Sequence, residues 1–327
     1  MIIYAHNKKG EEELLVIEVK NVTKKYGSFV AVNDISFTIN DGEVVGLLGP
    51  NGAGKSTTMN MITGYIEQTD GEIIINGYDT IKKAKKAKGQ IGYMPEGVPL
   101  YNDLTVKEFV TYMAELHKVD RKQKKERVQG VLKEVGLDSM QNKLIKNLSR
   151  GQKQRVSLAG TIVFDPKILI LDEPTVGLDP KQITEIRSLI KNLGKKHTVI
   201  LSSHILSEVS QICDRVIIIN KGKIVAIDTP ENLENKVSNN NIVYVTVEDT
   251  NNKVNSLKID GISSITLLKT NEDGTKQYEI KANESININK IVFSEFAKQS
   301  ITILEMKKPE ATLEDAFMKI IKEGDLK

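Results

Sequence analysis

The sequence predicts an α/β protein with a sheet-based core, a helical insert and a small α+β domain near the C-terminal end. Three observations lead to this prediction. Short apolar runs such as VVGLL (44–48) are typical of strands buried in a parallel sheet. Between residues 107 and 141 the apolar residues recur every three or four positions, which indicates helices. Beyond a polar stretch at 237–241, strand-like and helix-like segments alternate again.

The core strands are predicted from apolar runs bounded by turn residues. The runs at 167–172 and 197–203 have apolar centres, as strands covered on both faces do. The last two runs surround Lys221 and Gly222 and predict a closing hairpin. The predicted strands are 14–20, 35–39, 44–48, a short one from Ile91, 167–172, 197–203, and the hairpin segments RVIIIN and KIVAID.

The C-terminal part is predicted to be a separate accessory domain. Its segments follow the order strand, weak helix, strand, strand, helix, strand, which is the split βαβ or ferredoxin-like arrangement. A last helix begins at Thr312, where Asp315 completes a capping box. The predicted division is an N-terminal extension at 1–13, a core domain at 14–236 with a helical subdomain at about 97–150, and the accessory domain at 237–327.

Composition and charge exclude several classes of protein. The net charge of +3 is too small to imply a nucleic-acid or membrane-surface partner by itself. No apolar run approaches the roughly 18 to 20 residues that span a bilayer. The single cysteine, Cys213, cannot form an internal disulfide and fits a reducing cytosol. Lysine-rich stretches at 82–88 and 121–127 are predicted to be solvated faces, because no aromatic residues are interleaved for stacking on nucleic acid.

The segment GPNGAGKS (49–56) predicts a phosphate site. It matches G-x-x-x-x-G-K-[ST] and directly follows the apolar run at 44–48. Glycines let the backbone wrap closely around phosphates and direct its N–H groups at them. Lys55 is expected to reach the β- and γ-phosphates, and Ser56 to offer its hydroxyl to Mg²⁺. The helix that begins here would direct its positive end at the anion.

The segment ILILDEP (168–174) supplies two acids to the same edge of the sheet. A buried strand delivers Asp172 to the carboxyl edge, where the phosphate loop also lies. Asp172 then fits a Mg²⁺ role, through water. Glu173 is the candidate general base for the attacking water. The two segments together predict a nucleoside triphosphatase.

The segment LSRGQKQRV (148–156) makes a family recognisable. The chain resembles the ATP-binding subunits of ABC transporters over about residues 14–235, with the family's LSGGQ signature present as LSRGQ and Arg150 in place of its first glycine. The resemblance implies that Ser149, Gly151 and Gln152 cover the γ-phosphate of ATP held by a second subunit, identical or closely related. The site would then form at a dimer interface. The residues themselves agree, because Ser149 and Gly151 stand just before a predicted helix (152–162) whose N-terminus can hold an anion.

The resemblance assigns further roles along the chain. Tyr26 matches the aromatic residue that stacks on adenine, Asp179 the loop that crosses the dimer interface, and His204 the switch histidine at the γ-phosphate. The predicted catalytic residues are therefore Glu173, His204 and Lys55, and the predicted metal site is Ser56, Glu96 and Asp172. The residues predicted to contact ATP are Tyr26, Gly49, Pro50, Asn51, Gly52, Ala53, Gly54, Lys55, Ser56, Thr57, Glu96, Ser149, Gly151, Gln152 and Asp179.

Glu96, in IGYMPEGVPLY (91–101), stands where the family places a glutamine that contacts Mg²⁺ and the attacking water. A glutamate offers an oxygen at the same reach but adds a negative charge beside the γ-phosphate. We therefore expect closure of the two subunits to depend more on Mg²⁺ than it would with a glutamine. This context resembles the ATPases that serve small ABC-2-type permeases in antibiotic, sodium and gliding-motility export. The ending TLEDAF (312–317) also resembles that branch.

The resemblance implies an ATPase that drives export through a separate transmembrane permease and lies on the inner, cytoplasmic face of the cell membrane. Two alternatives remain open: a non-transport ABC ATPase that acts on the ribosome, and an importer subunit. The ribosomal class is less favoured because its members usually carry two cassettes, whereas no second phosphate loop follows Lys55. Nothing in the motor motifs encodes the cargo.

Overall fold

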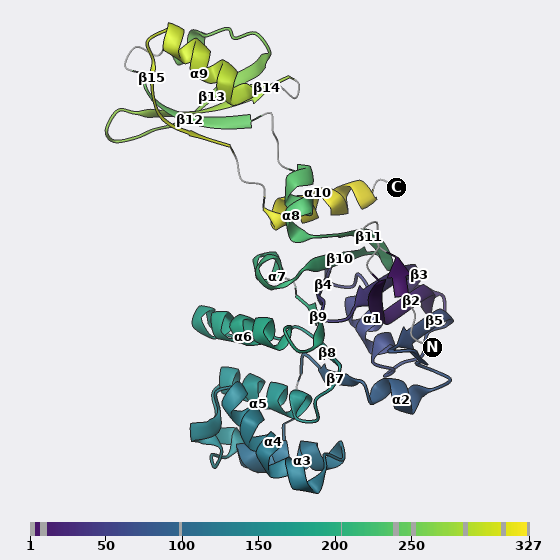
Figure 1. The fold of residues 1–327 in the computed structure, drawn as a ribbon. Coiled ribbons are helices and arrows are strands. Elements are labelled where there is room, and N and C mark those ends of the chain that lie inside the picture. Colours follow the sequence, from purple (N-terminus) through teal and green to yellow (C-terminus); the bar gives the residue numbers. More distant parts are fainter. Residues whose placement is uncertain are drawn as a thin grey trace. The chain divides into compact units, whose positions relative to one another are not determined.

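A six-stranded sheet within residues 44–228 runs in the order β11–β10–β4–β9–β8–β7 (Figure 1). Neighbouring strands are parallel except for β11, which returns antiparallel along β10. Every residue of β4, β8 and β9 is buried, as the apolar runs predict. The strands are β4 (Val44–Leu48), β7 (Ile91–Met94), β8 (Ile168–Leu171), β9 (Thr198–Ser202), β10 (Arg215–Asn220) and β11 (Lys223–Asp228).

The computed structural model describes residues 4–6, 12–97, 100–203, 205–237, 242–249, 253–283, 287–308 and 312–325. The chain divides into two units, Met1–Glu231 with Ile320–Lys327, and Asn232–Lys319. Each unit is described by itself. The predicted domain boundaries at 13/14 and 236/237 stay a prediction.

A second sheet in the first unit is antiparallel and packs its apolar face into the main core cluster. Ile17 and Val19 of β2 pair with Ile39 and Phe37 of β3 on one side, and with β5 on the other. The predicted strands at 14–20 and 35–39 are confirmed but are longer in the structure. The strands are β1 (Tyr4–His6), β2 (Glu12–Tyr26), β3 (Phe29–Asn40), β5 (Asp70–Ile75) and β6 (Tyr78–Asp79).

The helical insert is built on capped helices that pack against the core. Thr105 and Glu108 form a reciprocal capping box at the start of α3 (Val106–Leu116). The insert also contains α4 (Arg121–Glu134) and the short turns η1 (Asp138–Met140) and η2 (Ile145–Asn147). Helix α3 packs closely against α5, because a Cβ on Gly160 of α5 would lie 2.9 Å from the ring of Phe109 of α3. The other helices of this unit are α1 (Lys55–Ile62), α2 (Ala84–Lys88), α5 (Arg150–Ile162), α6 (Pro180–Leu193) and α7 (Leu206–Ile212).

The second unit contains a four-stranded sheet in the order β13–β14–β12–β15 (Figure 1). β14 is antiparallel to both β12 and β13, so these two run in the same direction on either side of it. This is the split βαβ arrangement that the segment order predicts. Its elements are β12 (Ile242–Glu248), η3 (Val254–Ser256), β13 (Ile262–Thr270), β14 (Lys276–Ala282), α9 (Ile288–Lys298) and β15 (Thr302–Lys307). The remaining helices are α8 (Pro230–Val237) and α10 (Leu313–Asp325).

One predicted element of this unit differs. The weak helix expected at 251–258 is only the single turn η3, and residues 250–252 lie outside the described part. The carboxylate of Asp249 accepts the backbone N–H groups of Lys253 and Val254 and the hydroxyl of Tyr278. Asparagine and serine are weak helix formers that compete for the backbone. The buried Asp249 therefore holds a turn where a longer helix was expected. The capping box of Thr312 and Asp315 is confirmed.

We expect the second unit to depend on the one face of α9 that packs on its sheet. Phe296 is fully buried in the cluster around Tyr278, whereas Phe293 on the same helix is 62% exposed. Phe296→Ala should therefore lower the free energy of unfolding by about 3 to 5 kcal/mol. Phe293→Ala should change it by less than about 0.5 kcal/mol. Hydrogen exchange of the β12 and β14 amides in urea measures both, and equal losses of protection would contradict the assignment of the packed face.

Candidate functional site

The loop 49–54 joins β4 to α1 and needs glycine at its two ends. A Cβ on Gly49 would lie 2.2 Å from the carbonyl oxygen of Ile219. Gly54 has φ +106°, and a Cβ there would lie 2.8 Å from the oxygen of Ala31. Only glycine fits such close approaches and positive φ without strain. The loop is thereby fixed between β3 and β10 at the start of α1.

Lys55 is the buried cation of this loop. Its ammonium donates hydrogen bonds to the carbonyl oxygens of Gly49 (2.7 Å) and Pro50 (3.2 Å). Burial lowers the pKa of Lys55, and the carboxylates of Glu173 and Asp172 offset part of this effect. The attraction of both carboxylates favours the charged ammonium. The structure thus brings together the lysine and the two acids that the sequence singled out.

Asp172 and Glu173 follow β8 and are joined through Ser202. The Ser202 hydroxyl donates to Asp172 Oδ1 (2.6 Å) and accepts the backbone N–H of Glu173 (2.9 Å). Glu173 has φ +49°, a conformation that non-glycine residues rarely adopt. Sequence reasoning missed Ser202, which is the last residue of β9. Its position at the carboxyl end of a strand parallel to β8 is the only signal that the sequence carries for it.

A cavity of about 570 Å³ brings the phosphate loop, Glu173 and Glu96 together. Phe29, at the start of β3, is 63% exposed and lies on its wall. The sequence analysis chose Tyr26 for the adenine. Tyr26 ends β2 and pairs with Phe29 across the hairpin, but it is not among the cavity's described lining residues. The lining residues are Phe29, Ala31, Asn51, Gly52, Gly54, Lys55, Ser56, Thr57, Glu96, Glu173 and Val176.

The signature segment lies at the start of α5, away from this cavity's lining. Ser149 and Gln152 form a reciprocal capping box, with Ser149 Oγ accepting the Gln152 N–H. Gly151 is buried beneath Gln182 of α6, whose side chain fills the place of a Cβ. Asp179 caps α6 by accepting the Gln182 N–H (2.9 Å). None of Ser149, Gly151, Gln152 and Asp179 lines the cavity in the described part of the chain. The predicted switch residue, His204, lies outside the described residues.

The oxygen donors around the cavity suit a magnesium ion. Ser56 and Glu96 line it, and Asp172 is buried next to Glu173. Mg²⁺ prefers oxygen ligands and is usually held by one or two carboxylates together with substrate phosphates. Within the described residues no group of three His, Cys, Asp or Glu side chains could hold a metal without such phosphates. The residues therefore fit a Mg²⁺ ion that arrives with a nucleotide.

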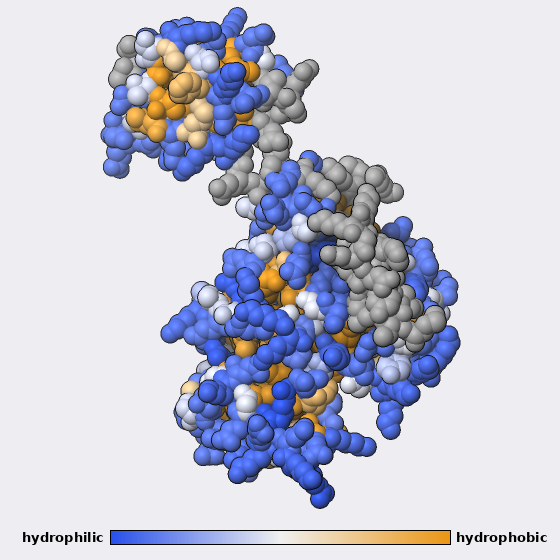
Figure 2. All heavy atoms as spheres, in the orientation of Figure 1, coloured by the Kyte–Doolittle hydropathy of each residue, from blue (hydrophilic) through white to orange (hydrophobic). Residues whose placement is uncertain are grey.

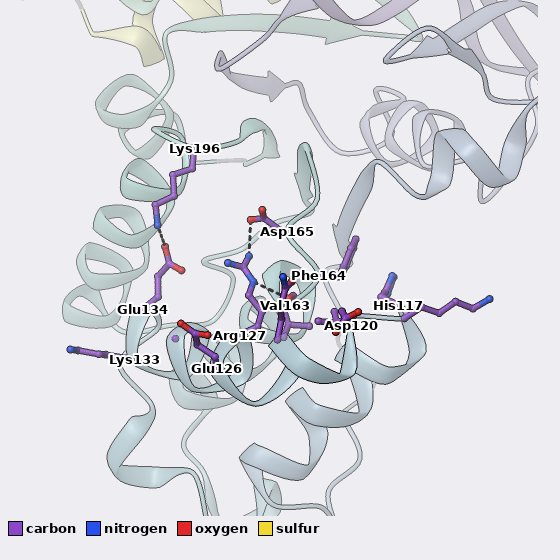
Figure 3. Close-up of a pocket in the computed structure, with 14 residues that line it drawn as sticks. His117, Asp120, Glu126, Arg127, Lys133, Glu134, Val163, Phe164, Asp165 and Lys196 are labelled. Carbon is purple, nitrogen blue, oxygen red and sulfur yellow. Dashed lines mark hydrogen bonds and ion pairs between the residues drawn. The ribbon is translucent and has the colours of Figure 1, made fainter.

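A larger cavity, of about 1020 Å³, lies between α4 and the turn after α5 (Figure 3). Arg127 of α4 crosses it and donates to the carbonyl oxygens of Ile162 and Val163 and to Asp165. A second ion pair joins Glu134 to Lys196 at 2.8 Å. These two ion pairs join α4 of the insert to core residues on the other side of the cavity, so the cavity lies at the junction of insert and core.

Comparisons with known proteins agree with this geometry. Residues 32–176 match the ABC transporter family. The linearmycin resistance ATP-binding protein of Bacillus subtilis is 34% identical, over 93% of this chain and 98% of its own length. The bacitracin transport ATP-binding protein of Bacillus licheniformis is also 34% identical, over 95% and 99%.

A solved structure shares the core fold. It is the dimeric post-hydrolysis state of an ATP-binding cassette bound to ADP and phosphate, which is 28% identical with a TM-score of 0.59, over 65% of this chain and 98% of that one. Within the described residues, no helix combines the length and apolar character needed to cross a bilayer. The phosphate loop, the paired acids and the full-length relatives lead to one conclusion: the chain belongs to the ATP-binding proteins of ABC transporters, and is an ATPase whose hydrolysis of ATP is coupled to transport.

Proposed function

We propose that two copies of this chain, or this chain and a close relative, hydrolyse Mg·ATP between them and drive export through a separate membrane permease. The observation that carries the proposal is the single cavity lined by Lys55, Glu173 and Glu96. A cation, a candidate base and a further carboxylate face one space of the size of a nucleotide site. The protein would therefore act on the inner face of the membrane, where ATP is available.

In this mechanism each residue has a role that follows from its position. Backbone N–H groups of the loop and the start of α1 bind the β- and γ-phosphates. The Lys55 ammonium moves from its own loop's carbonyl oxygens to the phosphate oxygens and offsets their charge. Mg²⁺ held by Ser56, Asp172 and Glu96 would neutralise charge on the β- and γ-phosphate oxygens. Glu173 takes a proton from the water that attacks the γ-phosphate in line.

The signature segment supports a dimer. The exposed Ser149 and the buried Gly151 stand at the N-terminal end of a 13-residue helix, which is an anion site by its N–H groups and dipole. They do not line the cavity of their own chain, so this anion site is available to the γ-phosphate held by a second subunit. The related cassette of known structure is itself dimeric with ADP and phosphate bound. Each active site would then be completed by the other subunit.

The permease would dock on a groove of about 310 Å³ where the insert meets the core. Tyr65 (79% exposed), Tyr93, His117 and Phe164 line it, and the last two stack with parallel rings whose centroids are 3.7 Å apart. Exposed aromatic side chains around an apolar groove suit the insertion of a partner's helix. The groove includes residues of both α3 and β7, so a partner seated there would follow movement of the insert.

Export is the direction that the relatives favour. The full-length relatives are named for linearmycin resistance and bacitracin transport, and both match the C-terminal unit as well as the core. Removal of such compounds from the cell is the direction that gives resistance. The cargo itself would be selected by the permease, because the motor motifs of this chain bind and hydrolyse ATP and encode no cargo.

Glu173→Gln should lower ATP hydrolysis at least about 100-fold, because the attacking water loses its base. ATP binding should persist, so the variant should collect as an ATP-bound dimer of twice the mass in light scattering. Glu67→Gln, at an exposed position, is the control and should turn over ATP as the unaltered chain does. A Glu173→Gln protein that stays monomeric with saturating Mg·ATP would contradict the shared site.

Ser202→Ala should lower the turnover of ATP about 10-fold, because two hydrogen bonds that orient Asp172 and Glu173 are lost. Affinity for ATP, measured with a fluorescent analogue, should change less than about 3-fold since Ser202 does not line the cavity. Ser210→Ala, an α7 hydroxyl bonded only to a local carbonyl, is the matched control. Unchanged turnover in Ser202→Ala would show that the backbone alone holds the two acids.

Tyr65→Glu should weaken capture of the permease by roughly 30-fold, which corresponds to about 2 kcal/mol for a central aromatic contact. The measurement is affinity purification of the tagged chain from gently solubilised membranes, with partners identified by mass spectrometry. Phe293→Glu, at an aromatic residue that is also exposed (62%) but lies in the second unit, is the control. Ribosomal proteins in place of a multi-helix membrane protein would overturn the transport proposal.

A further inference from the structure

The two departures from the family pattern, Glu96 and Arg150, line one cavity. This cavity has a volume of about 410 Å³ and lies beside the nucleotide cavity. Glu96 and Val176 belong to the lining of both cavities, so they form the wall between them. Arg150 and Lys153 of α5 supply the positive charges on the other side of the smaller cavity. A carboxylate that faces the phosphate site therefore has two cations behind it.

Arg150 is held in place by the loop that follows Glu173. A Cβ on Gly177 would lie 2.2 Å from Arg150 Cζ, so the guanidinium lies against the backbone of Gly177. Gly177 also has φ +70°, which further restricts this position to glycine. Gln154, one turn along α5, donates a hydrogen bond to the carbonyl oxygen of Pro174 (2.8 Å). The start of α5 and the segment 174–177 are thus joined at two points.

A cation at this position is unexpected from the helix alone. Arg150 is the first residue of α5, and positive charge near a helix N-terminus is disfavoured by the helix dipole. In the predicted mechanism the same helix end must also bind an anion. Arg150 therefore needs a negative partner for part of the cycle, and Glu96 is the carboxylate that shares its cavity.

We propose that Arg150 acts through Glu96: its guanidinium offsets the negative charge that the carboxylate brings to the phosphate site, and this matters most when no cation is bound there. This inference rests on the role proposed for Glu96 at Mg²⁺. It explains how a chain with an acid in this place still accepts a γ-phosphate. Arg150 also belongs to the signature segment, which is proposed to bind the ATP held by the second subunit. The residue would therefore link the two nucleotide sites of the dimer.

The test is a double-mutant cycle on ATP binding, with Arg150→Ala, Glu96→Gln and the double variant, each measured with Mg²⁺ and with a chelator. With Glu96 present, Arg150→Ala should weaken ATP binding about 3- to 10-fold more in the presence of the chelator than in the presence of Mg²⁺. The reason is that bound Mg²⁺ itself neutralises the charge of the Glu96 carboxylate. In the Glu96→Gln background the same substitution should have an effect of less than about 1.5-fold. Arg150→Lys keeps the positive charge, so it should bind ATP in the presence of the chelator nearly as well as the unaltered chain.

Arg121→Ala is the matched control, because Arg121 is the first residue of α4 as Arg150 is of α5, and it lies outside the shared cavity. A merely structural Arg150 would weaken ATP binding equally with and without Mg²⁺, and equally in both backgrounds, which would overturn the inference. The binding measurement needs no permease. A chain that shows the coupling but captures no membrane partner would therefore contradict the transport proposal and leave this one standing.

Discussion

The nucleotide site depends on keeping one lysine charged inside the protein. Burial opposes the charge on Lys55, and the nearby carboxylates of Glu173 and Asp172 oppose that effect. An unpaired buried ammonium would be costly, and so would an unpaired Asp172, which is also buried. The phosphate loop after β4 and the acids after β8 must therefore lie at the same edge of the sheet. The parallel pairing of β4 with β9, and of β9 with β8, provides this arrangement.

Local sequence was enough to predict the parts of the site that follow a single strand. Val44–Leu48 and Ile168–Leu171 are apolar runs, and both strands lie where they were predicted. The first leads through the loop 49–54 to Lys55, and the second leads directly to Asp172. The capping boxes of Ser149 and Thr312 are also local patterns, because the two partners are three residues apart. Such features need no knowledge of the tertiary structure.

The parts that sequence reasoning missed depend on contacts between distant segments. Ser202 acts on Asp172 across 30 positions of the chain, and a serine at the end of a strand is otherwise unremarkable in a sequence. Phe29 becomes a candidate for nucleotide contact only because β2 and β3 form a hairpin beside the phosphate loop. The guanidinium of Arg150 against Gly177 belongs to the same class, since neither residue predicts the other.

In the second unit, too, the local patterns were predicted and the contacts between distant segments were missed. The strands β12 and β14 follow from the alternation of apolar residues, whereas the reduction of a helix to η3 follows from one buried carboxylate. Asp249 accepts hydrogen bonds from two backbone N–H groups and from Tyr278, whose pKa burial raises to about 12, with the bond to Asp249 adding to the effect. A buried acid needs this many donors to remain satisfied. Because the donors come from both the turn and β14, the turn is fixed to the sheet, and the unit has a polar contact that specifies its packing as well as an apolar core.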